Sequence, residues 1–125
     1  MDYTIRVERE IKVTQQDIDD IIATAFEGGI NYWCCKAEVV GDYLGEFASE
    51  QISRGGTVRL YDSVEDATYE LTLENFMSGL TKAIEENWYS DYGWCDGHLI
   101  DTCNVDADVA DTIIQLALFD DVIYG

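Results

Sequence analysis

The segment Ser53-Arg54-Gly55-Gly56-Thr57 places an arginine among glycines and hydroxyl residues, in a chain that has only seven Lys and Arg residues. Glycines let backbone N–H groups approach an anion, the guanidinium offers a two-pronged donor, and the hydroxyls add further donors. Arg59 lies two residues beyond Thr57, on the same side of an extended strand. This pattern predicts a phosphate-binding loop. A Gly-Gly turn that leaves Arg54 in solvent is the plainer alternative.

Aromatic rings are the second requirement of a nucleotide site, because a base is held by stacking and by hydrogen bonds to its edges. We expect Trp33 in the core and the segment of residues 87–101 as a surface loop that presents aromatics. Core and protein interface remain alternatives for most of these rings. The aromatic candidates are Tyr32, Trp33, Trp88, Tyr89, Tyr92 and Trp94.

The sequence contains no clear set of catalytic residues. Nucleophilic catalysis needs a base, and His98 is the only histidine. No serine lies in a Gly-x-Ser-x-Gly elbow. Carboxylates are so abundant that no Asp/Glu pair stands out as an acid/base dyad. We therefore expect a protein that binds rather than an enzyme, and one that needs no cofactor.

A zinc site is disfavoured by spacing. Cys95, His98 and Cys103 lie in one short segment, but a closed site needs four ligands. The adjacent Cys34 and Cys35 would point to opposite faces of a strand. Small buried hydrophobes and a loop histidine are the simpler interpretation.

A calcium loop is disfavoured as well. Asn104, Asp106 and Asp108 resemble the start of such a loop, but Val109 replaces its glycine and Gln115 its last glutamate. Acids at this position are more typical of a capped helix N-terminus. We expect no metal ligand here.

Length and charge restrict the remaining classes. The 125 residues predict one domain over residues 1–125, and 47% hydrophobic residues suffice for a core. A net charge of -19 makes direct nucleic-acid binding implausible. No apolar run is long enough for a membrane span, and the N-terminus lacks a signal-peptide layout. With four cysteines expected as reduced thiols, the sequence predicts a cytoplasmic protein that does not act at a membrane.

Hydrophobic periodicity predicts an α+β fold, with a small antiparallel sheet packed against about three helices. A capping box at Thr14 and Asp17 marks the first helix start, and Thr72 caps the second. Residues 41–53 have no clean period and are expected to form a loop with one helical turn. The predicted strands are residues 3–13, 30–40, 57–62, 68–71 and 122–124, and the predicted helices are residues 15–27, 72–87 and 106–119.

Several longer segments carry a resemblance to a known family. They are the opening of residues 3–10, Gly28-Gly29-Ile30-Asn31-Tyr32-Trp33-Cys34, Gly41-Asp42-Tyr43-Leu44-Gly45-Glu46, Gln51-Ile52-Ser53-Arg54-Gly55-Gly56 and Asp101-Thr102-Cys103-Asn104-Val105-Asp106-Ala107. Together with the length and acidity, they make nearly the whole chain resemble the Thoeris anti-defence sponge family of small phage and prophage proteins.

This resemblance implies a non-catalytic protein in the cytoplasm of an infected bacterial host. It would bind cyclic ADP-ribose isomers, and in some members cyclic oligonucleotides, and keep these immune signals from their effector. Members assemble as dimers and higher homo-oligomers. The Arg54-Gly55-Gly56-Thr57 loop would contact phosphate, shared between subunits about a symmetry axis. The ADP-ribose-like ligand would lie against Phe76, His98, Asn104 and Asp106.

Two other hypotheses remain open. An acidic surface can imitate the DNA phosphate backbone and occupy the basic cleft of a CRISPR effector or restriction nuclease, in which case Arg54 is incidental. The chain can also be an interaction module of a mobile element that buries its aromatic loop against a protein. Under the mimic hypothesis the active surface would be Asp17, Asp19, Asp20, Asp108, Asp111, Asp120 and Asp121.

Overall fold

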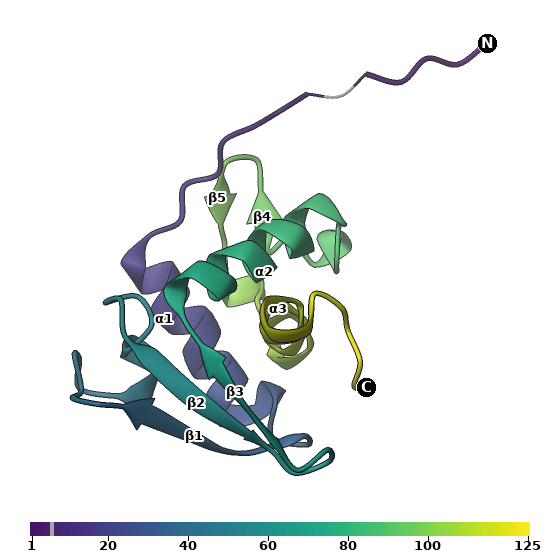
Figure 1. The fold of residues 1–125 in the computed structure, drawn as a ribbon. Helices are drawn as coiled ribbons and strands as arrows, with labels where there is room; N and C mark the ends of the chain where they lie inside the picture. The colour runs from purple at the N-terminus through teal and green to yellow at the C-terminus, as the bar shows by residue number, and fades with distance from the viewer. Residues whose placement is uncertain (6) are drawn as a thin grey trace.

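A computed structural model describes residues 1–5 and 7–125 of the chain, and these residues form the α+β fold that the periodicity predicts. The fold of these residues has three α-helices and a three-stranded sheet. Figure 1 shows the helices gathered on one side of this sheet. The main elements are α1 (Gln15–Thr24), β1 (Cys34–Val40), β2 (Thr57–Asp62), β3 (Ala67–Leu71), α2 (Leu73–Glu85), β4 (Cys95–Asp96), β5 (Leu99–Ile100) and α3 (Ala107–Phe119).

The sheet has the strand order β1-β2-β3, and both pairs are antiparallel. Burial alternates along β2: Val58, Leu60 and Asp62 are buried, whereas Thr57, Arg59 and Tyr61 are only partly covered. One face of the sheet therefore packs on the helices and the other faces outward. The predicted hairpin of residues 57–62 and 68–71 is confirmed, with β3 beginning one residue earlier.

Local capping signals explain where the helices begin. The Thr14 hydroxyl accepts from the Asp17 N–H, and the Asp17 carboxylate accepts from the Thr14 N–H. Thr72 and Asn75 form the equivalent box before α2, and Asp106 caps α3 by accepting from Val109. α1 is followed by a π-helical turn, Ala25–Gly29. The expected helical turn in residues 41–53 is the short 3-10 helix Ala48–Glu50.

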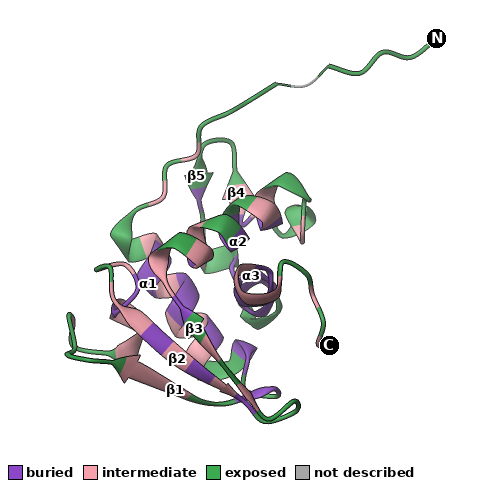
Figure 2. Ribbon diagram, in the orientation of Figure 1, coloured by how far each residue is buried: buried purple, intermediate pink, exposed green. Residues whose placement is uncertain are grey.

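The core lies between the sheet and the helices, where Figure 2 shows the buried residues of α1, α3 and β2. Its largest side chains are Trp33, Trp94 and Phe76. Close approach of α2 to α3 requires Gly79, because a Cβ there would lie 2.5 Å from the Ala117 backbone nitrogen. The core position expected for Trp33 is confirmed.

The N-terminal strand predicted over residues 3–13 is not formed. Arg6 lies outside the described residues. Residues 1–5 extend away from the body, whereas Arg9, Glu10 and Lys12 bond to the turn between β4 and β5, and we call residues 1–5 and 7–12 the N-terminal arm (Figure 1). Within the described arm, only Lys12 bridges another strand, through Leu99 of β5. Alternating residues favour extended backbone, but a strand also needs a neighbour to pair with.

The surface loop expected over residues 87–101 is confirmed only in part, because Tyr92 is 41% exposed but Trp94 is not. The segment of residues 87–101 contains the hairpin of β4 and β5, and Trp94 is buried with its indole donating to the Trp88 carbonyl, 2.8 Å away. Residues 122–124 form no strand in the described chain. Instead Tyr124 stacks on Trp33 with ring centroids 5.5 Å apart.

Among the described residues, no helix has the length and apolarity needed to cross a bilayer. All four cysteines carry free thiols.

Candidate functional site

The two glycines of the predicted phosphate loop are used to build a turn. Gly55 has a φ of +87°, and its N–H donates to the Ile52 carbonyl at 2.9 Å. Gly56 packs so closely on Gln51 that a Cβ would lie 2.4 Å from the amide nitrogen, and its N–H donates to the Gln51 carbonyl. These N–H groups are therefore committed to the turn, and an anion here must be bound by side chains.

Arg54 is positioned by two other elements. Its Nη1 donates to the Glu50 carbonyl at 3.1 Å and lies 3.6 Å from the Asp19 carboxylate on α1, and its Nη2 lies 3.8 Å from the Glu50 carboxylate. Both carboxylate distances exceed those of direct hydrogen bonds. The side chain is 30% exposed. The guanidinium is thus held at the surface with donor capacity left for a ligand.

Ser53 belongs to the same arrangement. Its hydroxyl lies 2.5 Å from the second carboxylate oxygen of Asp19 and 3.4 Å from the Glu50 carbonyl. The Asp19 carboxylate therefore accepts a hydrogen bond from Ser53 and lies beside the Arg54 guanidinium. These two contacts connect the loop to α1. A phosphate that binds Arg54 competes with Asp19 and Glu50 for the same cation.

Glu50 carries its negative charge beside Arg54. The N–H groups of Phe47 and Glu46 donate to its Oε1 at 3.0 and 2.8 Å, and these bonds lower the pKa of Glu50 below its ordinary value. Burial opposes this shift, and the Arg54 charge adds to it. The same carboxylate thus shapes the loop before it and holds the arginine after it.

The loop before the arginine carries two exposed aromatic side chains. Tyr43 is 60% exposed and Phe47 is 59% exposed. Their loop is tied to the Arg54 turn because Gln51 accepts from the Leu44 N–H at 2.9 Å and donates to the Asp42 carbonyl at 3.1 Å. A Cβ on Gly45 would lie 3.4 Å from Arg54 Cζ. We call Tyr43, Leu44, Phe47, Ser53 and Arg54 the Arg54 patch.

Tyr43 and Phe47 were not among the candidates suggested by the sequence. Their loop has no helical or strand period, so periodicity says nothing about which rings are covered. The one available signal is the presence of two aromatics in a glycine-containing loop just before the arginine.

Arg59 lies on the outer face of the sheet, where its Nη2 is 3.3 Å from the Glu70 carboxylate. Thr57 shares this face, as the alternation predicts. Glu38 and Glu70 are the register partners of Arg59 on the two neighbouring strands. Arg59 therefore belongs to the charged surface of the sheet, and its place in ligand binding stays a prediction.

The second predicted group is dispersed. Phe76 is fully buried, so its ring is covered in this arrangement. His98 lies in the β4–β5 turn, with Nδ1 2.8 Å from the Glu10 carbonyl. Asn104 donates to Asp101 at 3.0 Å, and Asp106 caps α3. Each of the four therefore has a structural role in the chain, and their binding role stays a prediction.

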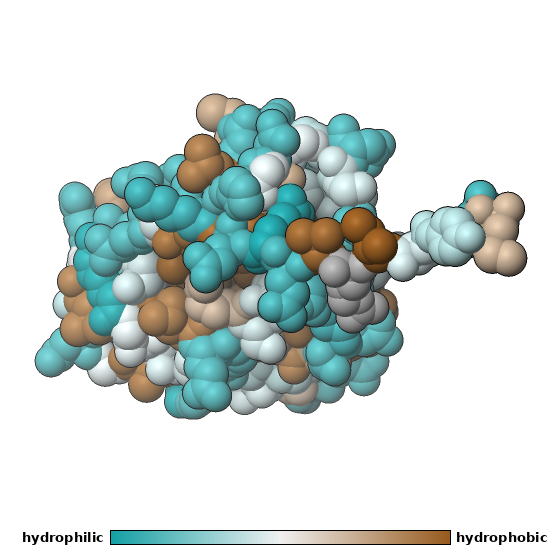
Figure 3. Space-filling model, turned by 90° about the horizontal axis from the view of Figure 1, so that it is seen from above, coloured by the Kyte–Doolittle hydropathy of each residue, from teal (hydrophilic) through white to brown (hydrophobic). Residues whose placement is uncertain are grey.

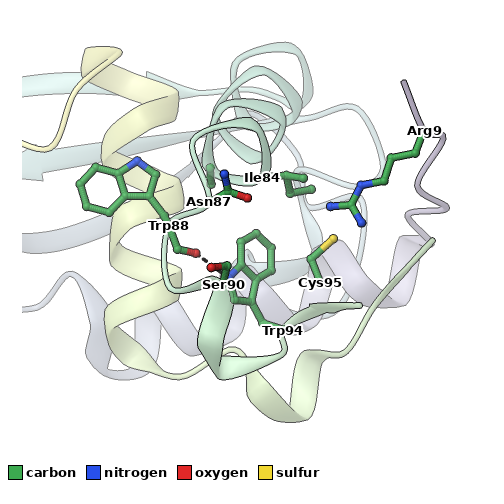
Figure 4. Close-up of a pocket in the computed structure, with 8 residues that line it drawn as sticks. Arg9, Ile84, Asn87, Trp88, Ser90, Trp94 and Cys95 are labelled. Carbon is green, nitrogen blue, oxygen red and sulfur yellow. Dashed lines mark hydrogen bonds between the residues drawn. The ribbon is translucent and has the colours of Figure 1, made fainter. Parts of the chain in front are cut away.

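The main cavities found among the described residues are not lined by the Arg54 patch. A small one of about 20 Å³ lies between the end of α2 and the β4–β5 hairpin, lined by Arg9, Trp88, Trp94 and Cys95 among others (Figure 4). It is water-sized and too small for a nucleotide. A groove of about 870 Å³ runs between the arm and α2.

The acidic residues proposed as a phosphate mimic do not form one exposed surface. Asp111 is buried and accepts hydrogen bonds from Tyr32, Trp33 and Gln115 at 2.5 to 2.9 Å. Asp19 is buried against Ser53 and Arg54. Both carboxylates have internal partners, so neither faces a basic cleft.

Comparison with family models, with curated proteins and with solved structures gives no match for this chain. The functional argument therefore depends on the geometry of the site.

Proposed function

We propose that this protein sequesters nucleotide signals of a bacterial immune system, namely cyclic ADP-ribose isomers and cyclic oligonucleotides, in the cytoplasm of a phage-infected host. It binds the signal without converting it and so acts as an anti-defence protein. The observation that carries this proposal is the Arg54 patch, in which a surface guanidinium and a hydroxyl lie in a turn that is hydrogen-bonded to a loop with two exposed aromatic side chains.

The patch supplies the two kinds of contact that a nucleotide needs. Arg54 offers a planar donor fork to a phosphate, and the Ser53 hydroxyl adds a donor when a ligand draws it from Asp19. Tyr43 and Phe47 offer apolar ring faces to a base, and stacking of this kind tolerates different bases. Such a surface suits a class of related cyclic nucleotides better than one compound.

Competition between a bound phosphate and the neighbouring carboxylates for Arg54 also supports reversible binding. Asp19 and Glu50 neutralise Arg54 in the free protein, so the guanidinium is not left alone in a chain of net charge -19. A phosphate replaces these weak contacts with closer hydrogen bonds. The overall negative field slows the approach of the anion, and its effect falls as salt rises.

The experiment is isothermal titration calorimetry of the purified protein against cyclic ADP-ribose isomers and cyclic di- and trinucleotides. Bound ligand is then released by heat denaturation and identified by chromatography. The proposal predicts saturable binding and recovery of intact ligand. Degraded ligand would replace it with an enzymatic function, and no heat of binding across the panel would contradict it.

A further inference from the structure

The N-terminal arm, which the structure describes at residues 1–5 and 7–12, has an anchored half and a free half. Arg9 donates to the Gly97 carbonyl, His98 Nδ1 lies beside the Glu10 carbonyl, and Lys12 donates its N–H to the His98 carbonyl, each at 2.8 Å. Residues 1–5, 7 and 8 make no hydrogen bond with another described residue. Figure 3 shows the end of this half projecting beyond the outline of the body.

The free half exposes an apolar face. Tyr3, Ile5 and Val7 alternate with polar residues and are 84%, 85% and 76% exposed. Ile11 and Val13 continue the same side of the arm and are partly buried against the core. Large apolar side chains in such a row, on extended backbone, have the pattern of a half-buried strand whose partner is absent from the single chain.

The same arm borders the large groove of the molecule. The groove is lined on one side by Val7, Ile11 and Val13 and on the other by Met77, Leu80 and Ile84 of α2. Its apolar lining continues the apolar face of the arm. Tyr3 and Ile5 lie on the free half of the arm, so they do not cover the groove of their own chain.

Charge distinguishes this segment from the rest of the protein. Residues 1–12 contain three acidic and three basic residues, whereas the remaining residues contain four basic residues against 23 acidic ones. Two bodies so rich in acid repel each other over most of their surfaces. Because the arm has equal numbers of acidic and basic residues, a second copy can approach it without this electrostatic repulsion.

We infer that the N-terminal arm pairs antiparallel with the arm of a second copy about a two-fold axis, so that Tyr3 and Ile5 of each chain cover the groove of the other. This dimer uses a surface distinct from the Arg54 patch and requires no nucleotide.

The anchored half fixes which groups are free to pair. The even-numbered residues Glu10 and Lys12 bond toward His98. On an extended strand the N–H and C=O groups of odd-numbered residues point to the opposite edge, where a second strand can bond. The pairing therefore joins odd-numbered residues to odd-numbered ones.

One register satisfies this condition and matches the charges. It places Tyr3 opposite Ile11, Asp2 opposite Lys12, and Val7 opposite its own copy on the two-fold axis. Directly opposed side chains share a face of the ribbon, so all the apolar residues lie toward the groove. An isologous contact of this kind closes as a dimer.

The first test is sedimentation equilibrium of the nucleotide-free protein over a concentration series, with Ile5→Asp and Val64→Asp variants. Val64 is also exposed, at 58%, but lies in the β2–β3 turn. We expect a wild-type dimer, at least a tenfold weaker dimer for Ile5→Asp, and no change for Val64→Asp. A wild-type monomer, or equal behaviour of the two variants, would overturn the inference.

The register has its own test, mild oxidation of Val7→Cys followed by non-reducing mass analysis and peptide mapping. Opposed hydrogen-bonded residues lie about 5.5 Å apart between Cα atoms, which is within disulfide reach. We expect a covalent dimer joined through the two substituted positions. Val64→Cys controls for chance collisions and for the exposed native thiols. Equal cross-linking of both variants, or none for Val7→Cys, would contradict the register.

Discussion

The guanidinium of Arg54 lies 3.6 Å from the carboxylate of Asp19, which places the cation proposed to bind phosphate beside an acid of α1. Asp19 also holds the Ser53 hydroxyl, so one buried carboxylate orients both donor side chains. The free site is thus prepared in position and partly neutralised. A bound phosphate must compete with the chain's own acids, and that competition makes the site testable.

Removing the charge of Glu50 is expected to strengthen nucleotide binding. In Glu50→Gln the amide oxygen still accepts from Glu46 and Phe47, but the negative charge 3.8 Å from Arg54 is gone. Exposed ion pairs contribute about 0.2–1 kcal/mol, so affinity should rise by about 1.5- to 5-fold in calorimetry. Glu46→Gln removes the same charge from the same loop without touching Arg54. Equal gains for both variants would assign the effect to net charge alone.

The aromatic rings are expected to contribute to affinity independently of charge. Stacking of a base on an aromatic ring is worth about 1–3 kcal/mol, so Phe47→Ala or Tyr43→Ala should weaken binding by about 5- to 150-fold. Tyr92→Ala is the matched control, because this ring is also exposed but lies in the short helix Ser90–Tyr92. If Phe47→Ala and Tyr43→Ala both bind the nucleotide as tightly as wild type, a base does not stack on these rings.

Asp62 is expected to stabilise the fold in a pH-dependent way. It accepts from the Tyr124 and Tyr69 hydroxyls at 2.6 and 2.9 Å and from the Val64 and Glu65 N–H groups. Burial opposes ionisation, but these bonds outweigh it and lower the pKa of Asp62. A lowered pKa gives stability that is complete above the unfolded value of about 3.9 and lost as pH falls through the folded value.

Urea unfolding of Asp62→Asn measures this effect. At pH 7 the free energy of unfolding of the variant should be about 1–3 kcal/mol lower than that of wild type, because hydrogen bonds to a charged carboxylate are replaced by hydrogen bonds to a neutral amide. The difference from wild type should narrow below about pH 4, where Asp62 of the unfolded wild-type chain begins to protonate while the folded carboxylate is still ionised. Asp66→Asn in the same turn is the control, since Asn tolerates its φ of 52°. A difference that stays constant down to pH 2 would contradict the assignment.

Gly79→Ala tests the packing of α2 on α3. The added Cβ would lie 2.5 Å from the Ala117 nitrogen and 2.7 Å from the Ile113 carbonyl oxygen, and backbone cannot move aside as a side chain can. We expect a loss of about 1–3 kcal/mol in the free energy of unfolding, although alanine favours helix. Ser78 lies on the exposed side of the same helix, so the free energy of unfolding of Ser78→Ala should equal that of wild type or be slightly higher. A Gly79→Ala variant as stable as wild type would refute the close contact.

Local signals were enough to predict the helices and the main hairpin. Thr14, Thr72 and Asp106 each bond to a residue three positions on, so their roles can be read from neighbouring letters. The alternation of β2 likewise follows from a strand with one covered face. These elements are specified by interactions within a few residues along the chain.

Long-range partners limited the rest of the prediction. Tyr3, Ile5 and Val7 alternate with polar residues as in a strand, but they are exposed because no other described segment of the chain covers them. The burial of Trp94 and the stacking of Tyr124 on Trp33 join segments distant in the chain. The Arg54 loop was found from its residue types, whereas Asp19 as its partner became visible only in three dimensions.

The most direct test of nucleotide binding at the Arg54 patch is a calorimetric comparison of Arg54→Ala with Arg59→Ala. Both variants lose one positive charge that lies beside carboxylates, Asp19 and Glu50 for Arg54 and Glu70 for Arg59. The account predicts that Arg54→Ala lowers affinity at least tenfold for a ligand that wild type binds, while Arg59→Ala changes it less than threefold. Equal losses, or a greater loss for Arg59→Ala, would contradict the placement of the phosphate at Arg54.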